Sequence, residues 1–200
     1  MLKIRRLIVC ITCIIFLQLS PLNSSENKNL TAIGSNDAKV TVKVFSSLSC
    51  PHCAHFHNEI FEKLKRDYID KDRVRFEHHS FPLDLQALNA EKILKCFKDN
   101  NKKFNFLSEI YKNQESWYRG KDINNINLKL TKIAEKHGIN NDKITFCLND
   151  ESLEDEILSE RIMGNKKYSI KSTPTVFINE KKYQGEYDYE EFAREIEKLL

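Results

Sequence analysis

The chain of 200 residues is long enough for one domain, or for one domain that carries a large insertion. Its formal net charge is +3, and Lys3, Arg5 and Arg6 at the N-terminus account for that excess. The remainder is therefore close to neutral, which excludes the basic surface expected of a protein that binds nucleic acid.

Residues 1–25 have the pattern of a secretory signal peptide, with positive residues before an apolar run at 7–19 and polar residues after it. The run is shorter than the roughly 20 residues that cross a bilayer. A membrane-anchored form stays open, because the cleavage site is not well marked. Cys10 and Cys13 lie inside the run and are interpreted as small apolar residues. We therefore expect export to the periplasm, where disulfides persist.

The next segments predict one half of an α/β core. Residues 26–37 are polar and are expected to form a loose N-terminal arm. Apolar and polar residues then alternate within 38–47, which predicts a strand, and 73–81 predict a second strand. Between them a helix is expected from Pro51 onwards. Its apolar face would carry Phe56, Ile60, Phe61 and Leu64.

The rest of the chain predicts a helical block followed by the other half of the core. Apolar residues recur at helical spacing from about 84 to 163. Strands are expected at 173–179 and 181–185, joined by a turn near Asn179 and Glu180. A last helix would begin after Asp188, with Phe192, Ile196 and Leu199 buried. The expected fold is an α/β core at 38–82 and 170–200, interrupted by an α-helical insertion at 83–169.

Cys50-Pro51-His52-Cys53 lies where the first strand meets the first helix. Unpaired N–H groups and the helix dipole at a helix N-terminus favour a thiolate over a thiol. Pro51 suits the first helical position, and the His52 ring can also stabilise a neighbouring thiolate. Thiol pKa values in such motifs fall from ~8.5 to between ~3.5 and ~7.5. A stabilised thiolate favours the reduced pair, so the disulfide is expected to be oxidising and readily transferred.

A zinc site is the alternative for this segment, because His55 and His57 follow the two cysteines. Zinc-binding pairs are usually carried on structural pieces separated by a dozen or more residues, whereas these four crowd the start of one helix. We expect no metal and no cofactor. His55, His57, His78, His79 and His137 are interpreted as surface or core histidines.

Thr173-Pro174 is the second informative motif, because a proline at the start of a strand is tolerated only at edges and turns. An X-Pro bond in such a place is a candidate for the cis form. A cis bond would turn the Thr173 backbone outwards, where it can pair with an extended substrate. An ordinary trans proline at an edge strand is the alternative.

Cys50-Pro51-His52-Cys53 after a strand and Thr173-Pro174 before another resemble the thioredoxin superfamily, and within it the DsbA-like thiol–disulfide oxidoreductases. "FPLD" at 81–84 and "STPTVFIN" at 172–179 are also similar to motifs of that family. The resemblance implies a thioredoxin-like fold with a helical insertion. It implies that Cys50 is the nucleophile, that Cys53 is the resolving cysteine, and that cis-Pro174 faces them.

The sequence departs from the family at two positions and adds a second cysteine pair. Thr173 stands where the best-known strong oxidases carry valine, and Val44 stands where many relatives carry an acidic residue beneath the cysteines. Cys96 and Cys147 resemble a pair found in the helical block of some relatives, which implies a structural disulfide. Two buried, unreactive thiols are the alternative for Cys96 and Cys147.

The leading hypothesis is a periplasmic oxidase that donates the Cys50–Cys53 disulfide to reduced or unfolded exported proteins. The resemblance implies reoxidation by a membrane quinone-linked partner, and a monomer is the simplest expectation. The alternatives are a disulfide reductase or isomerase that uses the same cysteines, which Thr173 keeps open, and a redox-inert thioredoxin-like chaperone.

Overall fold

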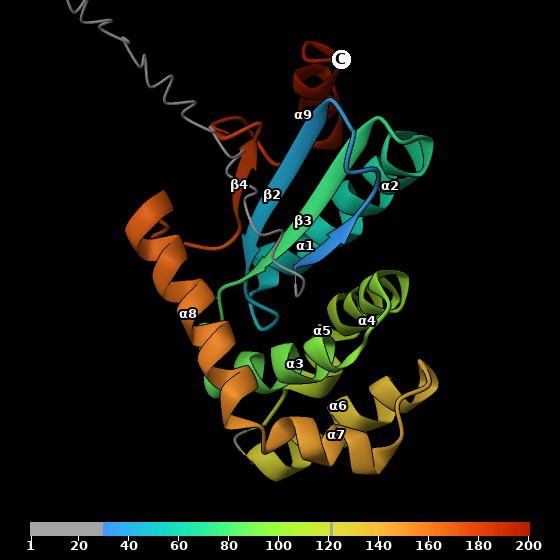
Figure 1. The fold of residues 1–200 in the computed structure, drawn as a ribbon, viewed down its shortest axis with the longest axis vertical. Coiled ribbons are helices and arrows are strands. Elements are labelled where there is room, and N and C mark those ends of the chain that lie inside the picture. The colour runs from blue at the N-terminus through green and yellow to red at the C-terminus, as the bar shows by residue number, and fades with distance from the viewer. Residues whose placement is uncertain (1–29, 121) are drawn as a thin grey trace, which may run out of the picture.

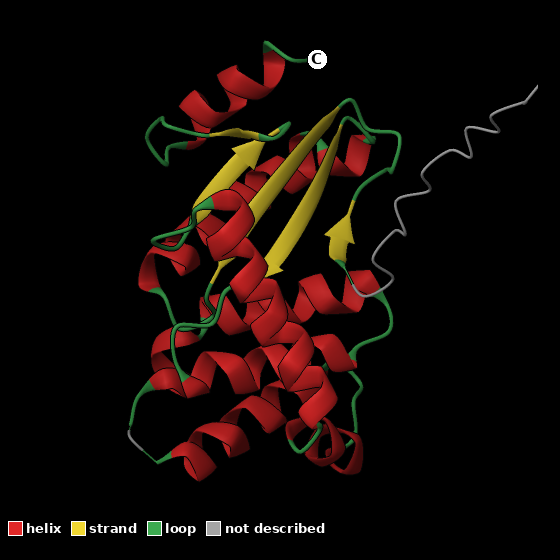
Figure 2. Ribbon diagram, turned by 60° about the vertical axis from the view of Figure 1, so that its left-hand side comes forward, coloured by secondary structure: helices red, strands yellow, loops and turns green. Residues whose placement is uncertain are grey.

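The computed structural model describes residues 30–120 and 122–200, in which a five-stranded sheet lies beside a block of helices (Figure 1, Figure 2). The predicted signal peptide at 1–25 lies outside the described residues. In the part of the chain that is described, no helix has both the length and the apolar character needed to cross a bilayer. The strands are β1 (Thr31–Ile33), β2 (Val40–Ser46), β3 (Val74–Ser80), β4 (Thr175–Ile178) and β5 (Lys181–Lys182).

The strand order in the sheet is β1-β3-β2-β4-β5. The central strands β2 and β3 are parallel, and every other neighbouring pair is antiparallel. In this register Val44 of β2 pairs with His78 on one side and with Val176 of β4 on the other. A parallel pair needs a crossover connection, and the helix that follows Cys50 supplies it.

Alternation along the strands gives the sheet two unlike faces. The inner face, which carries Val44 and His78, is covered by the helix that follows Cys50 and by the C-terminal helix. The outer face carries Phe45 and His79, whose rings stack with centroids 4.8 Å apart. Phe45 belongs to a second, smaller apolar cluster, which also contains Phe81, Ile170 and Phe177.

The helix predicted from Pro51 is continuous but not uniform. It consists of α1 (Pro51–Phe56), a π-helical turn η1 (His57–Phe61) and α2 (Glu62–Asp67), followed by the short 3-10 helix η2 (Ile69–Lys71). The four predicted core residues are all buried, as expected. The wide π turn was not predicted, and it lets His57 face the core as well, where its ring stacks on Phe61 at 4.3 Å.

The expectation of a loose arm at 26–37 is wrong for Thr31–Ile33, which form β1. This strand pairs antiparallel with the edge of β3, and Thr31 and Ala32 are buried there. Three residues are too few to show a periodic pattern, and the pairing is made by backbone groups that any sequence carries. At Gly34, with φ +94°, a side chain would collide with the carbonyl oxygen of Val74.

The predicted helical block lies between β3 and β4 in the chain and below the sheet in Figure 1. Most of its helices begin at an Asp or Asn whose side chain accepts a hydrogen bond from the first turn, as Asp84 does from Ala87 N. The boundaries of the insertion, 83–169, stay a prediction. The helices are α3 (Leu85–Cys96), α4 (Asn100–Lys112), α5 (Gln114–Tyr118), α6 (Ile123–Lys136), α7 (Asn141–Leu148) and α8 (Glu151–Tyr168).

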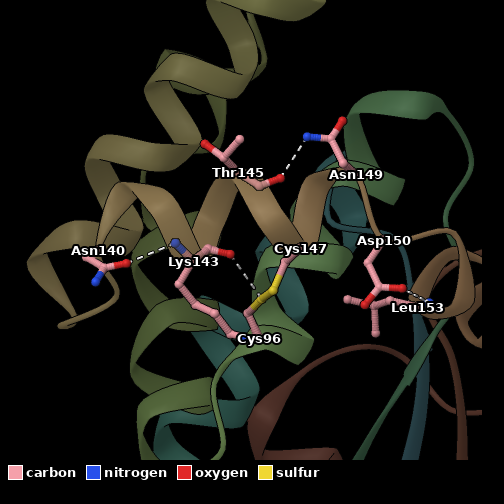
Figure 3. The surroundings of a disulfide bond; sticks show 8 residues. All are labelled: Cys96, Asn140, Lys143, Thr145, Cys147, Asn149, Asp150 and Leu153. Atoms are coloured by element: carbon pink, nitrogen blue, oxygen red, sulfur yellow. Dashed lines mark hydrogen bonds between the residues drawn. A yellow bond between two sulfur atoms is a disulfide. The ribbon is translucent and has the colours of Figure 1, made fainter.

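The disulfide between Cys96 and Cys147 joins the end of α3 to α7 (Figure 3). The two Cα atoms are 6.3 Å apart, and 51 positions of sequence separate them. Next to the bridge, Asn140 accepts a hydrogen bond from Lys143 N at 2.9 Å, and the Asn149 side chain donates to the Thr145 carbonyl at 2.9 Å. Both ends of α7 are therefore fixed close to the bridge.

The C-terminal segment forms the predicted hairpin and helix, with two differences. The turn is at Asn179 and Glu180, with φ values of 45° and 65°, but β5 ends at Lys182 rather than at residue 185. Asp188 caps α9 (Tyr189–Glu197) by accepting from Glu191 N at 3.1 Å. Leu199 is 39% exposed, so its predicted burial is wrong, because the helix ends before its stripe reaches that residue.

Candidate active site

Cys50 and Cys53 lie at the point where β2 meets the first helical turn. Cys50 is the residue that precedes α1, with extended backbone angles, and Pro51 occupies the first helical position. The Cys50 carbonyl accepts hydrogen bonds from the N–H groups of Cys53 and Ala54, each at 3.1 Å. The sulfur of Cys50 is thereby placed at the open N-terminus of the helix, while Cys53 is turned inwards and is 1% exposed.

The Thr173-Pro174 segment faces the cysteines from the start of β4. The peptide bond between Thr173 and Pro174 is cis, as the resemblance implied. The Cys50 thiol donates to the Thr173 carbonyl oxygen at 3.3 Å, across 123 positions of sequence. On the far side of the proline, the Tyr187 hydroxyl donates to the Pro174 carbonyl at 3.1 Å. The structure therefore brings together the two motifs that the sequence singled out.

The environment lowers the pKa of Cys50 to about 5. The main cause is a hydrogen bond from the Cys53 thiol, which is stronger when Cys50 is a thiolate. Partial burial acts in the opposite direction, and the Thr173 side chain and the N–H groups of Cys53 and His52 lower the pKa further. These contributions favour a charged sulfur at position 50 near neutral pH.

The same environment raises the pKa of Cys53 well above its usual value. Burial is the main cause, and the neighbouring Cys50 sulfur adds to it. Cys53 therefore keeps its proton at pH values at which Cys50 has already lost its own. One helical turn thus holds a sulfur that readily carries charge next to a sulfur that readily keeps its proton.

The sequence predicts that the His52 ring stabilises the Cys50 thiolate, but in the structure another group of His52 has this effect. The side chain of His52 is exposed, and the backbone N–H is the His52 group that lowers the pKa of Cys50. His55 is exposed as well, whereas His57, His78 and His79 are buried. The histidines nearest the cysteines in sequence are consequently not the ones that lie in the core.

Gln114 is a residue of this site that the sequence did not indicate. Its side chain is 8% exposed, and its amide nitrogen donates to the carbonyl oxygens of Leu48 at 2.8 Å and Cys50 at 3.1 Å. Gln114 begins α5, so the helical block holds the loop that carries Cys50. The only sequence signal was a polar residue near Trp117 in an otherwise ordinary helix.

A thiolate at a helix N-terminus, a protonated partner one turn away and a cis-proline opposite them define a thioredoxin-like disulfide-exchange site, here in a fold with a helical insertion. A thioredoxin family model matches residues 26–198, and the chain belongs to that family. The predicted resemblance to DsbA-like proteins is confirmed by the relatives and structures that match.

The chain is 31% identical over 183 residues to disulfide bond formation protein D of Bacillus subtilis, with 86% of this chain and 78% of that protein covered. The crystal structure of Wolbachia pipientis alpha-DsbA1 matches with a TM-score of 0.78 at 28% identity, covering 90% of this chain and 93% of that chain. Oxidised BdbD of Bacillus subtilis matches with a TM-score of 0.75 at 25% identity, over 86% and 93% of the two chains.

A Rickettsia bellii relative, named a protein-disulfide oxidoreductase, is 28% identical over 153 residues, which is 76% of this chain. The match covers 58% of that relative's own length.

Proposed function

We propose that this protein is an enzyme, a protein thiol:disulfide oxidoreductase that donates its Cys50–Cys53 disulfide to exported proteins in the periplasm. The observation that carries the proposal is the opposite displacement of the two cysteine pKa values, with Cys50 at about 5 and Cys53 well above its usual value. This arrangement stabilises the reduced pair and makes the disulfide a good oxidant.

The proposed reaction begins when a substrate thiolate attacks Cys50 of the oxidised pair. A mixed disulfide forms between the substrate and Cys50, and the Cys53 sulfur leaves and takes up a proton. A second substrate thiolate then attacks the substrate sulfur of the mixed disulfide. Cys50 leaves as a stabilised thiolate, and the substrate departs with a new disulfide.

Substrate binding is assigned to the Thr173 backbone next to cis-Pro174 and to apolar surface around the cysteines. Leu83 and Leu85 are 50% and 54% exposed. The N–H of Leu83 donates to the Ser47 hydroxyl at 3.2 Å, which places this apolar surface beside the loop that leads to Cys50. An extended and partly unfolded chain is the substrate that this combination suits.

Equilibration of the purified protein with glutathione buffers tests the direction of the reaction. The expected potential lies between about −120 and −180 mV, the range of strong protein oxidants. A potential near that of thioredoxin, about −270 mV, would overturn the oxidase and support the reductase or isomerase. Thr173 is the observation that favours this second candidate, because it stands where the best-known strong oxidases of the family carry valine.

The remaining parts of the proposal rest on the sequence. Export relies on the signal-peptide pattern of residues 1–25, and reoxidation by a membrane quinone-linked partner relies on the resemblance alone. A monomer is proposed as the working state. A redox-inert chaperone would keep its function after Cys50→Ser, whereas the proposed enzyme would lose its ability to transfer a disulfide.

A further inference from the structure

Residues 172–174, which face the cysteines, accept hydrogen bonds through their backbone carbonyl groups from side chains in the described part of the chain. The Thr175 hydroxyl donates to Ser172 at 2.7 Å, the Cys50 thiol to Thr173 at 3.3 Å, and the Tyr187 hydroxyl to Pro174 at 3.1 Å. Each carbonyl of the segment therefore has a side-chain donor, and the donors differ in whether they last through disulfide exchange.

The bond from Tyr187 is the one that can hold the segment throughout disulfide exchange. The Thr175 bond closes a turn between residues three apart and joins the segment to nothing further away. The Cys50 bond needs a thiol proton, so it is absent when Cys50 is a thiolate or part of the disulfide. Among the described residues, Tyr187 is then the side chain whose hydrogen bond still ties this segment to another part of the fold.

The Pro174 carbonyl takes a side-chain donor because the neighbouring strand stops short of it. Among the described residues, the last backbone donor on that edge of β4 is Tyr183 N, which donates to the Val176 carbonyl at 2.9 Å just after β5 ends. Carbonyl groups two residues apart point to the same edge of a strand, so the next one belongs to Pro174. The Tyr187 hydroxyl thus takes the place of the next N–H of a partner strand.

The ring of Tyr187 packs against the helix that carries the cysteines. Its centroid is 5.6 Å from that of Phe56 in α1, with the two rings at 80°, and 6.0 Å from that of Tyr183. Phe192 of α9 contacts the rings of both Phe56 and Tyr183, at 5.9 and 5.0 Å, and completes a cluster of four rings. Such contacts favour one orientation of each ring. Tyr187 therefore contacts the cysteine helix with its ring and the 172–174 segment with its hydroxyl.

The Tyr187 hydroxyl stays a donor over the pH range in which the cysteines react. Burial is the main cause that raises the pKa of Tyr187 above the ordinary tyrosine value of 10.0, and the charge of Cys53 raises it further. The phenol therefore keeps its proton while Cys50, with a pKa of about 5, changes between thiol and thiolate. Ionisation of Cys50 removes its own hydrogen bond to the segment but not the one from Tyr187.

We propose that Tyr187 is a positioning residue, which holds residues 172–174 against the cysteine helix so that an extended substrate meets a Thr173 backbone already in place. The inference rests on the proposed function and adds how that enzyme receives a peptide. Tyr187 acts through Pro174 and not on the reacting sulfurs. A segment that is ordered before the substrate arrives loses less conformational freedom on binding, and that loss would otherwise weaken the complex.

The test measures how fast the oxidised protein reacts with two dithiols at neutral pH. One is a short unstructured peptide with two reduced cysteines, which can pair with the Thr173 backbone. The other is dithiothreitol, which has two thiols but no peptide groups and therefore reports the reactivity of the Cys50–Cys53 disulfide alone. The ratio of the two rates isolates the contribution of the backbone segment.

The test variant is Tyr187→Phe, which removes the hydroxyl and keeps the ring in its cluster. Tyr183→Phe is the matched control, because it removes a hydroxyl from the neighbouring ring, whose acceptor is the Glu186 carbonyl at 2.8 Å rather than Pro174. Each variant loses one hydrogen bond to a backbone carbonyl, so a general effect on stability would be similar in the two.

In Tyr187→Phe the rate with the peptide is expected to fall about tenfold, the upper end for the loss of one neutral hydrogen bond, while the rate with dithiothreitol stays the same. Tyr183→Phe should match the unmodified protein with both dithiols. An unchanged peptide rate in Tyr187→Phe, or an equal fall with both dithiols, would overturn the proposal. A peptide rate that falls as far in Tyr183→Phe would also overturn it, because the loss would then come from the aromatic cluster.

A measurement on the unmodified protein covers the case in which Tyr187→Phe does not fold. NMR follows the Tyr187 hydroxyl proton, which exchanges slowly with water while it is hydrogen-bonded, in the reduced and oxidised forms. The proposal expects slow exchange in both forms, and rapid exchange in the oxidised form would overturn it. A glutathione potential that rejects the oxidase leaves these tests intact, because a reductase or isomerase also receives its peptide substrates at this segment.

Discussion

Cys50 and Cys53 are identical residues within one helical turn, and their position alone separates their chemistry. Cys50 precedes the first turn, where the N–H groups of His52 and Cys53 point towards its sulfur. Cys53 is one turn further in, and burial raises its pKa. The Cys53 thiol is also the first cause of the low pKa of Cys50, so each cysteine sets the behaviour of the other.

Replacing Cys53 with alanine should therefore raise the pKa of Cys50 from about 5 towards the ordinary thiol value of 9.0. Thiolate absorbance at 240 nm of the reduced protein, followed from pH 3 to pH 10, measures the shift. His52→Ala is the matched control, and it should move the pKa less, because the His52 backbone N–H remains. Equal pKa values in Cys53→Ala and the unmodified protein would contradict the assigned cause.

The depressed pKa also makes the stability of the reduced protein depend on pH. Because the folded pKa of about 5 lies below the unfolded value of 9.0, ionisation of Cys50 stabilises the folded state most above pH 9. The gain declines as the pH falls and is lost on passing through about 5. The oxidised protein has no such titration.

Gln114 shows how a residue far away in sequence can fix the site. Replacing it with leucine would remove the amide donor of the Leu48 carbonyl oxygen, whereas the Cys50 carbonyl would keep the N–H groups of Cys53 and Ala54. The free energy of unfolding should fall by about 1–3 kcal/mol, the cost of leaving buried polar groups unsatisfied. Urea denaturation measures the loss, with Ser116→Ala on the exposed side of α5 as the control. An unchanged midpoint in Gln114→Leu would contradict this role.

Local residue patterns were sufficient to predict the centre of the site but not its surroundings. Cys50 and Cys53, and the proline at 174, are recognisable because a few neighbouring residues define their chemistry. Gln114 is not, since its partners lie 64 and 66 positions away and no local pattern indicates them. Glu91 left a weak signal, a charge among the apolar residues Ala90, Ile93 and Leu94 of a buried helix.

Among the secondary-structure elements, the spacing of apolar residues predicted the strands and helices that pack against the core. It predicted β2, β3 and the helices of the insertion, because each buries a regular stripe. It could not predict β1, which is held by edge pairing, or the π turn η1, which retains a helical pattern. The disulfide between α3 and α7 came from the resemblance, because spacing alone does not define a cysteine pairing.

Removal of that disulfide tests how much it contributes to the helical block. Cys96→Ala/Cys147→Ala should lower the free energy of unfolding by about 4 kcal/mol, the chain-entropy value for a loop of about 50 residues. Urea denaturation in a Cys50→Ala/Cys53→Ala background keeps the active-site pair out of the measurement. In that background, protein without residues 1–25, and so without Cys10 and Cys13, should have no free thiol before substitution. Two free thiols would contradict the bridge.

At the scale of the whole molecule, β3 connects the sheet to the helical block through both of its faces. On the inner face His78 and Ser80 bind Glu91 of α3, and on the outer face His79 contacts Glu160 of α8. Lys95 of α3 also binds Glu160, 3.2 Å away, so α3 and α8 are tied to each other as well. The contacts on both faces of β3 therefore join the sheet to the helical block.

On the outer face of the sheet, His79 and Lys95 both bind Glu160, and His79 also contacts Glu77. This ionic network makes stability depend on pH, and the pKa shifts of Glu160 and His79 give the sign. Burial by itself would raise the pKa of Glu160, but hydrogen bonding to His79 and the charge of Lys95 lower it to about 2. The stabilisation by the Glu160 carboxylate is therefore present above pH 4.5 and is lost as the pH falls through about 2. Burial by itself would lower the pKa of His79, but Glu160 and Glu77 outweigh it and raise the pKa. The stabilisation by the charged His79 ring is therefore complete below pH 6.5 and is lost as the pH rises past that raised pKa.

Glu160→Gln should therefore reduce stability most between pH 4.5 and 6.5. The expected loss there is about 3 kcal/mol, because the substitution leaves buried positive groups partly uncompensated. Urea denaturation from pH 2 to pH 9 should show the two proteins converging towards pH 2. Above the raised pKa of His79 the difference should become smaller but persist, because Lys95 stays charged beside Glu160. Lys136→Gln, which removes an exposed ion pair with Glu109, is the control and should have little effect at any pH. A constant difference between Glu160→Gln and the unmodified protein would mean that Glu160 contributes by packing rather than by charge.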